Sequence, residues 1–599
     1  MSISDFDDPL DWRIARRAGN AMRPFNEAGV LESADVHVAQ RVTTLAEETD
    51  HSVALAVALA ARALRGGSVC VDLTTVADDA GVAGLPWPDP GGWLAALRAS
   101  KLLGDPPVLR LYDDRLVYLD RYWREEEQVC ADLLTLSVPA ALPDVSGLAR
   151  LFPPGFEEQR AAAEIAVSQA VTVLTGGPGT GKTTTVARLL ALLAEQADRS
   201  GTIGLRIAMA APTGKAAARL SEAVAVEVGR LDAVDRQRLS GLQAVTLHRL
   251  LGSRPDTSVR FRHHRGNRLP HDVIVVDETS MVSLTMMARL LEAVRPDARL
   301  ILVGDADQLS SVEAGAVLAD LVEGLSGRDD VRVAALRTSH RFGRTIGALA
   351  EAIRIGDADR VVAQLRSGDE HVQFIECTDG ADRSAPLRAI LLPHALRLRE
   401  AAIAGAVETA LATLDEHRLL CAHRHGPFGV QYWNQRVQRW VAEETGQPAW
   451  SPWYAGRPLL VTANDYGLRV YNGDTGVVVA GADGLRAFIA GAAGPLDFAT
   501  SRLADIETMH AMTIHKSQGS QADEVTVLMP PQDSRLLTRE LFYTAVTRAK
   551  VKVRVVGTEA EVRAALARRA QRASGLRLRL QAGQPGVTPH PPMTARPQT

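Results

Sequence analysis

The chain has 599 residues and a mass of 64.3 kDa, and its 67 basic and 71 acidic side chains give a formal charge of −4. This near balance excludes a basic coat for nucleic acid, and a composition that is 46% hydrophobic and 23% charged excludes disorder throughout and collagen-like repeats. Lysine is rare, with 61 of the basic residues being arginine. Because a compact ammonium and a guanidinium are not interchangeable against phosphate, the six lysines are the first places to look for chemistry: Lys101, Lys182, Lys215, Lys516, Lys550 and Lys552.

The length predicts about four domains, at about 150 residues each. The sequence contains no apolar run of about 18 residues, and it begins with acidic residues where a signal peptide would be basic, so we expect a cytoplasmic protein. Its four cysteines lie far apart without a CxxC motif, which favours buried small hydrophobes over a zinc or iron–sulfur site: Cys70, Cys130, Cys377 and Cys421.

Residues 1–140 are rich in Ala, Leu and Val at helical spacing, which predicts a mostly helical domain. Near its end, alternating apolar residues around an Asp-Asp turn predict a short hairpin from Leu109 to Leu119. No catalytic constellation is visible in this region. We therefore expect it to dock on a partner.

The next stretches alternate short β-branched runs with helical segments, and this pattern predicts an α/β fold with parallel sheets. The expected strands cover 171–175, 205–211, 272–277 and 298–305 in a first domain, residues 141–330, and 551–557 in a second. The second α/β domain is expected over residues 331–454 and 508–573. Between its two parts, Gly-rich residues 455–507 predict a small inserted β module, and residues 574–599 read as a disordered tail.

A phosphate-binding loop follows the first of these strands. It lies between a strand and an amphipathic helix, the context that a P-loop requires. Its glycines let backbone N–H groups wrap the phosphates of ATP, Lys182 reaches the β and γ oxygens, and Thr183 binds Mg²⁺. We assign nucleotide binding to Gly176, Gly177, Pro178, Gly179, Thr180, Gly181, Lys182, Thr183 and Thr184.

The apolar run from Val273 to Val276 ends at Asp277 and Glu278. With the P-loop upstream, Asp277 is expected to hold Mg²⁺ and Glu278 to polarise the attacking water, an arrangement that fits hydrolysis better than storage of nucleotide. Gln308 follows another apolar strand, where its amide can sense the γ-phosphate.

Phosphoryl transfer gains from cations contributed across a domain boundary. Arg341, in TSHRFGR, and Arg548, in FYTAVTRAK, are the candidates, both in the second α/β stretch. A single arginine is more often a surface group, so it is the position of these two relative to the other motifs that singles them out.

The order of these motifs resembles that of superfamily 1 DNA helicases, and within them the RecD subunits of the RecBCD (exodeoxyribonuclease V) complex. The resemblance spans about Leu109 to Val556. It rests on GGPGTGKTTT, APTGKAAARL, TLHRLLG, DETSM, GDADQLSSVEAGAVL, HRFG, TIHKSQGS and YTAVTRAK, which match motifs I, Ia, Ib, II, III, IV, V and VI. Two departures are Thr279, where the family usually has Ala, and Ala522, where it commonly has an aromatic residue.

The resemblance implies two RecA-like motor domains with ATP between them, single-stranded DNA across both, and 5′-to-3′ translocation. It also implies a small inserted β-barrel, and association with RecB and RecC in which the N-terminal domain docks on RecC. Gln159 matches the glutamine that recognises adenine. DNA contacts are implied for Thr213, Lys215, Thr246, His248, Thr513, His515 and Lys516, although each hydroxyl could instead cap a helix and each histidine could be a core residue. The basic loop from Arg254 to Arg268 fits DNA, a partner or plain solvent about equally.

Two other functions stay open. One is a regulatory subunit with a vestigial ATPase, which the intact motif residues argue against. The other is a stand-alone helicase that acts on RNA or in conjugation. The chain lacks the long N-terminal extension of stand-alone RecD-like helicases, which favours a subunit of the complex.

Overall fold

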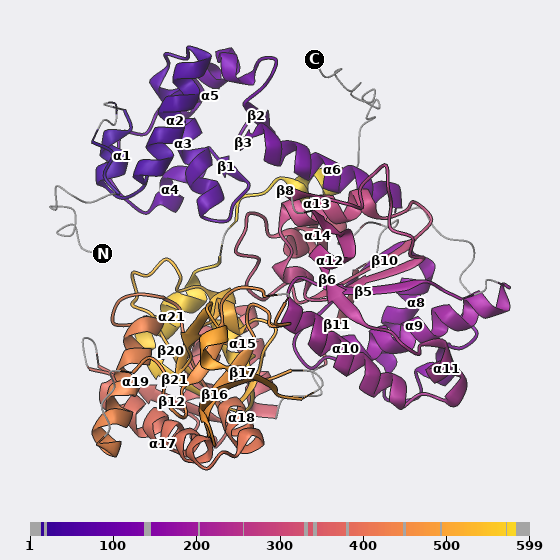
Figure 1. Cartoon of the computed structure of the whole chain (residues 1–599). Helices are drawn as coiled ribbons and strands as arrows, with labels where there is room; N and C mark the ends of the chain where they lie inside the picture. Colours follow the sequence, from indigo (N-terminus) through magenta and orange to yellow (C-terminus); the bar gives the residue numbers. More distant parts are fainter. Residues whose placement is uncertain are drawn as a thin grey trace.

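The computed structural model describes residues 13–16, 19, 21–136, 145–201, 204–254, 257–326, 328, 333–338, 344–378, 382–446, 451–465, 467–491, 494–570 and 572–582. Figure 1 shows an N-terminal domain in indigo, a first α/β domain in magenta and a second in orange and yellow. No helix in these ranges combines the length and the apolar character needed to cross a membrane.

The N-terminal domain is built around α3 (His51–Arg65), which is apolar on nearly every side. Asp50 caps this helix by accepting hydrogen bonds from two backbone N–H groups, and all residues from Val53 to Ala60 are buried. The helices around it are α1 (Arg23–Glu27), α2 (Ser33–Ala46), α4 (Val76–Ala80) and α5 (Pro90–Ala99).

A three-stranded antiparallel sheet completes this domain, in the order β1-β3-β2. Its strands are β1 (Cys70–Asp72), β2 (Leu109–Tyr112) and β3 (Leu116–Leu119). The hairpin predicted over 109–119 is confirmed, and both turn aspartates have the positive φ that such a tight turn uses. Helix α6 (Asp120–Leu136) then leads into the first α/β domain and packs on it.

The first α/β domain contains a six-stranded parallel sheet in the order β11-β4-β10-β9-β5-β6. Alternate residues of each strand enter two different cores, so helices cover both faces. The strands are β4 (Val171–Gly176), β5 (Ile207–Ala211), β6 (Ala244–Thr246), β9 (Val273–Val276), β10 (Arg299–Gly304) and β11 (Val333–Leu336). The helices are α7 (Leu148–Leu151), α8 (Glu157–Ser168), α9 (Lys182–Arg199), α10 (Gly214–Gly229), α11 (Ala233–Arg238), α12 (Leu247–Leu251), α13 (Leu284–Ala293) and α14 (Val317–Leu325). A two-stranded ribbon, β7 (Ser253–Arg254) with β8 (Thr257–Phe261), follows α12.

The boundary expected at residue 330 is wrong. Strand β11 pairs in parallel with β4, from Val333 opposite Val173 to Leu336 opposite Gly176, and therefore belongs to the first sheet. A short apolar strand carries no mark of the sheet it will join, because its partner is set by the edge that is free. The first domain thus extends to at least Leu336.

The second α/β domain has a five-stranded parallel sheet in the order β12-β21-β20-β13-β19. Its strands are β12 (Val372–Glu376), β13 (His417–Cys421), β19 (Ala511–Thr513), β20 (Ala522–Leu528) and β21 (Ala549–Gly557). Its helices are α15 (Arg344–Ile355), α16 (Ala358–Leu365), α17 (Ser384–Ile403), α18 (Val407–Glu416), α19 (Val430–Thr445), α20 (Arg539–Val546) and α21 (Glu559–Ala567). Ala522, where the family commonly has an aromatic, is fully buried at the start of β20.

The inserted segment forms a five-stranded antiparallel sheet in the order β17-β16-β15-β14-β18. Its strands are β14 (Pro458–Val461), β15 (Thr475–Gly481), β16 (Gly484–Ile489), β17 (Leu496–Ala499) and β18 (Ile506–Thr508). In the described residues the two edge strands, β17 and β18, do not pair with each other, so the hydrogen-bonded ladder is open. An inserted β module is present where it was expected.

The tail expected to be disordered from residue 574 contains a helix, α22 (Leu576–Ala582), and residues 583–599 lie outside the described part of the chain. Leu576 and Leu580 are one helical turn apart, and both are fully buried in the core shared by α6, α13 and α14. The Pro- and Gly-rich composition of the remaining tail hid this short apolar pair from the sequence analysis.

Candidate functional site

The P-loop joins β4 to α9, as the sequence predicts. Gly179 and Gly181 have φ of +79° and +88°, a backbone conformation that glycine adopts without strain. Lys182 is the first residue of α9, and its Nζ donates hydrogen bonds to the carbonyl oxygens of Gly176 at 2.6 Å and Gly177 at 2.9 Å. The loop therefore places the Lys182 ammonium at the N-terminus of α9. The ammonium and the free backbone N–H groups of this helix end both favour a bound anion.

Gln159 lies on α8 and is 3% exposed. Its amide nitrogen donates to the backbone carbonyl of Thr180, at 3.1 Å, so this side chain is fixed against the P-loop. The assignment of Gln159 to adenine remains a prediction, and the position beside the phosphate loop is compatible with it.

Asp277 and Glu278 follow β9 at the carboxyl edge of the first sheet. Burial raises the pKa of Asp277, the neighbouring Glu278 raises it further, and Lys182 acts in the opposite direction. Glu278 has a φ of +50°, a strained value for a residue with a side chain and one that is concentrated at functional sites. Thr279 is fully buried and donates a hydrogen bond to the carbonyl of Val276 at 2.9 Å, which accounts for its tolerance in place of Ala.

A cavity of about 680 Å³ brings the predicted ATP residues together. Its volume lies within the range of ligand sites. From the first α/β domain it is lined by Gly155, Phe156, Gln159, Pro178, Gly179, Gly181, Lys182, Thr183, Thr184, Ala216, Arg219, Leu220, Ala223, Arg230, Asp277, Glu278, Asp305 and Gln308, and from the second by Gly519, Gln521 and Arg548. Gly176, Gly177 and Thr180 belong to the same loop, but they do not line the cavity.

Hydrogen bonds join the two α/β domains at this cavity. Arg548 donates through Nη2 to Oε1 of Gln308 at 2.9 Å, and the amide of Gln308 donates to Asp305 at 2.9 Å. One residue further on, the backbone N–H of Leu309 donates to Oγ1 of Thr544 at 2.9 Å. Two residues predicted from separate motifs, Gln308 and Arg548, are thus in direct contact across the domain boundary.

Two further residues of this junction were missed by the sequence analysis. Arg219, on α10, donates to the carbonyl of Gly519 at 3.1 Å and to the amide oxygen of Gln521 at 2.6 Å. Tyr543 donates from its hydroxyl to Asp305 at 3.2 Å, and burial raises its pKa well above the usual value. Both lie inside the motif sequences, but their partners are far away in the chain, and no local pattern marks such contacts.

The donor set at the cavity fits a magnesium ion. The Thr183 hydroxyl and the Asp277 carboxylate line the same cavity, and hard oxygen ligands of this kind are what Mg²⁺ prefers beside nucleotide phosphates. Among the described residues no cluster of three or more His, Cys, Asp or Glu side chains is arranged to hold a metal by itself.

Of the three threonines expected to contact DNA, Thr213 and Thr246 cap α10 and α12, and Thr513 accepts a similar local hydrogen bond at the start of a short turn. The hydroxyl oxygens of Thr213, Thr246 and Thr513 accept hydrogen bonds from the backbone N–H groups of Ala216, Arg249 and Lys516, each at 3.2 Å. The capping role weighed from the sequence is therefore present. Contact with DNA remains a prediction for these residues.

The histidines and lysines of the expected DNA track lie in different environments. His248 is exposed and packs edge-on against Phe261, with ring centroids 5.7 Å apart, while burial lowers the pKa of His515. Lys516 forms an ion pair with Glu507 at 3.3 Å. Lys215 donates to the backbone carbonyl of Gly473, in the inserted module, at 3.3 Å.

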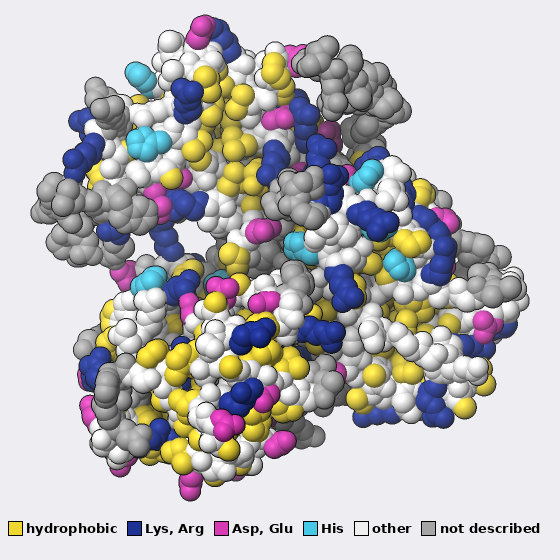
Figure 2. Space-filling model, in the orientation of Figure 1, with side chains coloured by type: hydrophobic (Ala, Val, Ile, Leu, Met, Phe, Trp, Pro, Cys, Tyr) yellow, Lys and Arg dark blue, Asp and Glu magenta, His cyan; other side chains and the backbone are white. Residues whose placement is uncertain are grey.

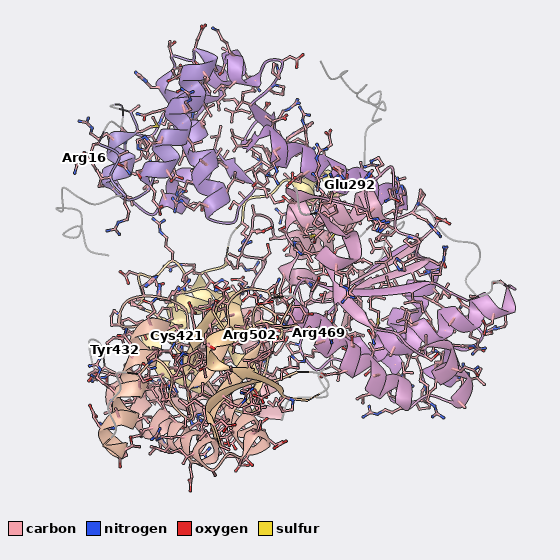
Figure 3. All side chains as sticks on the ribbon, viewed as in Figure 1. Arg16, Glu292, Cys421, Tyr432, Arg469 and Arg502 are labelled. Atoms are coloured by element: carbon pink, nitrogen blue, oxygen red, sulfur yellow. The ribbon has the colours of Figure 1, made fainter. Side chains whose placement is uncertain are left out.

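Lys215 therefore lies, partly buried, at the junction with the inserted module. Burial lowers its pKa to about 8. On the neighbouring Gly214, an added Cβ would come within 2.6 Å of the Tyr471 ring, so the loop between β14 and β15 lies directly on motif Ia. Arg469, in the same loop, lies where the insert meets the first α/β domain (Figure 3).

Comparison with known proteins finds relatives that match nearly the full length of this chain. RecBCD enzyme subunit RecD of Mycobacterium tuberculosis is 72% identical over 584 residues, which cover 97% of this chain and 99% of that protein. The RecD subunit of Mycolicibacterium smegmatis is 70% identical over 92% of this chain and 98% of that protein. The ATP-dependent RecD2 DNA helicase of Deinococcus radiodurans is 31% identical over 69% of this chain and 50% of its own length.

This chain belongs to the RecD family.

Three family models match separate parts of this RecD family member. The N-terminal domain of RecBCD enzyme subunit RecD matches residues 27–116, an AAA domain matches 159–314, and a UvrD-like helicase C-terminal domain matches 508–556. The second and third of these contain all the residues that line the cavity except Gly155 and Phe156. The RecD resemblance inferred from the short motifs is confirmed.

Two predicted features of this RecD family member need separate mention. The basic loop from Arg254 to Arg268 includes strand β8, and Figure 2 shows basic and histidine side chains gathered on this part of the first α/β domain. Arg262, His264 and Arg265 are exposed there, and Arg265 forms an ion pair with Asp132 of α6 at 2.8 Å. Arg341 lies outside the described residues.

Proposed function

We propose that this chain is an ATP-dependent 5′-to-3′ DNA helicase, the RecD subunit of a RecBCD exonuclease V complex that acts in recombinational repair of double-strand breaks and in DNA degradation. One observation carries the proposal. The P-loop, the two carboxylates, Gln308 and Arg548 line a single cavity between two α/β domains. Relatives named RecD and RecD2 DNA helicase support the same activity.

The motif residues of the cavity divide the work of hydrolysis. The P-loop amides and Lys182 bind the phosphates of ATP, and Thr183 and Asp277 hold Mg²⁺, which neutralises phosphate charge when bound. Glu278 orients the attacking water. Gln308 and Arg548 contact the γ-phosphate from opposite sides of the domain boundary. Hydrolysis removes these contacts, so the cleft between the two domains opens. Repeated closing and opening moves the two domains along the DNA strand.

We assign the architecture accordingly. The two α/β domains are RecA-like motors, over residues 141–336 and over 344–454 with 508–573, and the inserted sheet of 455–507 corresponds to the small β-barrel of the family. The N-terminal domain docks on RecC within a heterotrimer with RecB. Single-stranded DNA crosses both motors along Thr213, Lys215, Thr246, His248, Thr513, His515 and Lys516. A chain that works on chromosomal DNA in this way acts in the cytoplasm.

The test is ATP hydrolysis by Lys182→Gln in the assembled complex. Any ATP hydrolysis by the RecB subunit should be removed by mutation, so that only this chain hydrolyses ATP. We expect loss of DNA-stimulated ATPase with unchanged yield of the complex. The matched control is Lys101→Gln, which removes an exposed lysine of the N-terminal domain and should leave the rate unchanged. Undiminished hydrolysis by Lys182→Gln would refute the site.

Polarity has its own test. In the same complex, unwinding should require a single-stranded 5′ tail on the duplex. A preference for a 3′ tail would contradict the proposal, and Lys182→Gln should remove the unwinding of either substrate.

The stand-alone helicase and the regulatory subunit are separated by one purification. Isolation of the chain from its own cell should bring two larger subunits with it, and an enzyme that acts alone would bring none. A vestigial ATPase would assemble normally and show no DNA-stimulated hydrolysis in the complex with inactive RecB.

A further inference from the structure

The chain returns at its end to the domain where it began. Residues 572–582, here called the C-terminal strap, leave the second motor domain after α21 and lie beside α6 and α14 (Figure 1). The backbone of Ala573 bonds in both directions with the end of α3: its N–H donates to Oγ of Ser68 at 3.1 Å, and its carbonyl accepts from the N–H of Val69 at 3.0 Å.

A buried carboxylate holds the strap in place. Glu126 of α6 is fully buried and accepts hydrogen bonds from the Ser574 hydroxyl at 2.8 Å, the Gly575 N–H at 3.0 Å, the Tyr118 hydroxyl at 2.9 Å and Nε of Arg579 at 3.2 Å. Two of these four groups, Ser574 and Gly575, immediately follow Ala573. Since a buried carboxylate is costly unless its oxygens are satisfied, the strap has one defined position.

Arg572 is the point where the strap meets motif III. Its Nη1 donates to the backbone carbonyls of Glu313 at 3.1 Å and Gly315 at 3.4 Å. The same guanidinium lies flat against Gly67, where an added Cβ would be 2.8 Å from Cζ. One side chain thus contacts the end of α3 and the end of the motif III loop, which we define as residues 308–315.

The backbone of Gly67 has the conformation that this contact requires. It has a φ of +84° and terminates α3: its N–H donates to the Leu64 carbonyl, and the N–H of Ser68 donates to the Ala63 carbonyl. The carbonyl of Gly67 accepts in turn from the N–H of Gly315 at 2.9 Å. The N-terminal domain is therefore bonded directly to motif III, and Arg572 covers that bond.

The motif III loop is fixed at both ends. At residues 308 and 309 it is bonded to Arg548 and Thr544 beside the ATP cavity, and at residues 313 and 315 it is bonded to Arg572 and Gly67. Between them the Ser311 hydroxyl donates to the Glu313 carbonyl at 2.7 Å, so the loop is internally braced. A shift at one end of so short a braced loop is transmitted to the other.

We propose that Arg572 is a positioning residue that locks the motif III loop to the N-terminal domain, so that the placement of this domain sets the orientation of Gln308 for ATP hydrolysis. The proposal rests on the helicase function given above, because ATP turnover is its readout. In this arrangement a partner that moves the N-terminal domain changes the rate of ATP turnover, although the partner does not contact the nucleotide site.

The test compares Arg572→Ala with Arg569→Ala, a neighbouring exposed arginine, in the complex whose RecB cannot hydrolyse ATP. We expect kcat for DNA-stimulated hydrolysis to fall about tenfold in Arg572→Ala, because a catalytic group becomes misplaced. The KM for ATP should stay within about twofold, since the P-loop is untouched. Arg569→Ala should match the wild type, and Arg572→Lys, which can still donate to both carbonyls, should recover most of kcat.

A second variant approaches the lock from the other side. Gly67→Ala places a methyl group against the guanidinium and should lower kcat in the same way. Because both changes break one contact, the double variant should be no slower than the slower single variant, whereas independent sites would multiply. Yield of the complex is measured in parallel.

Three results would overturn the lock: a kcat for Arg572→Ala equal to the wild type, an equal loss in Arg569→Ala, or multiplying losses in the double variant. These are separate from failure of the helicase proposal. If Lys182→Gln retains hydrolysis, the ATP site itself is wrong; if Lys182→Gln is inactive and Arg572→Ala is normal, only the lock is wrong.

Discussion

Arg548 is a buried cation with neutral partners. It is 4% exposed, and its hydrogen bonds go to the amide of Gln308, the carbonyl of Thr544 and other neutral oxygens. A buried charge that lacks a paired opposite charge is costly, so it is retained where an anion will arrive. In the proposed reaction the γ-phosphate is that anion, and the arginine already lies where it is needed.

Arg548→Ala should therefore lower kcat for ATP hydrolysis by about 1,000-fold, the lower end of the range for an arginine that completes a phosphoryl-transfer site. Nucleotide affinity, measured with fluorescent ATP, should change little because the P-loop is intact. Arg548→Lys should not restore the rate, since an ammonium lacks the planar fork. The control is Arg563→Ala, which removes an exposed arginine of the same domain that pairs with Asp359 and Glu559.

Helix α22, in the last described part of the chain, contributes to a hydrophobic core. Its apolar residues follow an i, i+4 pattern, and Leu576 and Leu580 fill a core that also contains α14. The rest of the C-terminal strap, residues 572–575, depends on this anchor.

Leu580→Ala should destabilise the first motor domain by about 2–5 kcal/mol, the cost of removing a fully buried leucine and leaving a cavity. Thermal unfolding of the isolated full chain, followed by intrinsic fluorescence, measures this loss. Gln581→Ala, exposed on the same helix, should leave the midpoint unchanged. Equal midpoints for the two variants would show that the helix is dispensable to the core.

Elements with local signals were predictable, and elements that depend on distant partners were not. The P-loop strand, loop and helix are each encoded within a few residues, as is the Asp-Asp hairpin. Strand β11 was assigned to the wrong domain because only its pairing with β4 decides its sheet. Helix α22 was missed because the tail as a whole is rich in Pro and Gly without periodicity, and the helix is apparent only from the packing of Leu576 and Leu580 against distant residues.

At the scale of the molecule, the near-neutral charge fits a motor that grips DNA at a few points. The cations expected along the track are single residues, and Lys516 is already paired with Glu507. Because each neutralised phosphate adds to the salt dependence of binding, a track of this kind should bind DNA with a shallow slope.

Lys516→Gln should weaken binding of single-stranded DNA and reduce the slope of log K against log salt by about 0.7, the contribution of one phosphate contact on a single strand. Fluorescence anisotropy at several salt concentrations provides both values. Lys101→Gln is the matched control, because Lys101 is also paired with a glutamate at 3.3 Å but lies in the N-terminal domain. An unchanged slope in Lys516→Gln would remove this residue from the track.

The burial of Leu576 and Leu580 beside Leu116 and Tyr118 also has a consequence for synthesis. Domains generally fold from the N-terminus as the ribosome releases them. Here, however, the core that joins the N-terminal and first α/β domains lacks the C-terminal strap, with Leu576 and Leu580, until residue 582 has emerged. During translation of the second motor domain, that apolar surface stays open. The nascent chain should therefore be a client of chaperones until helix α22 docks.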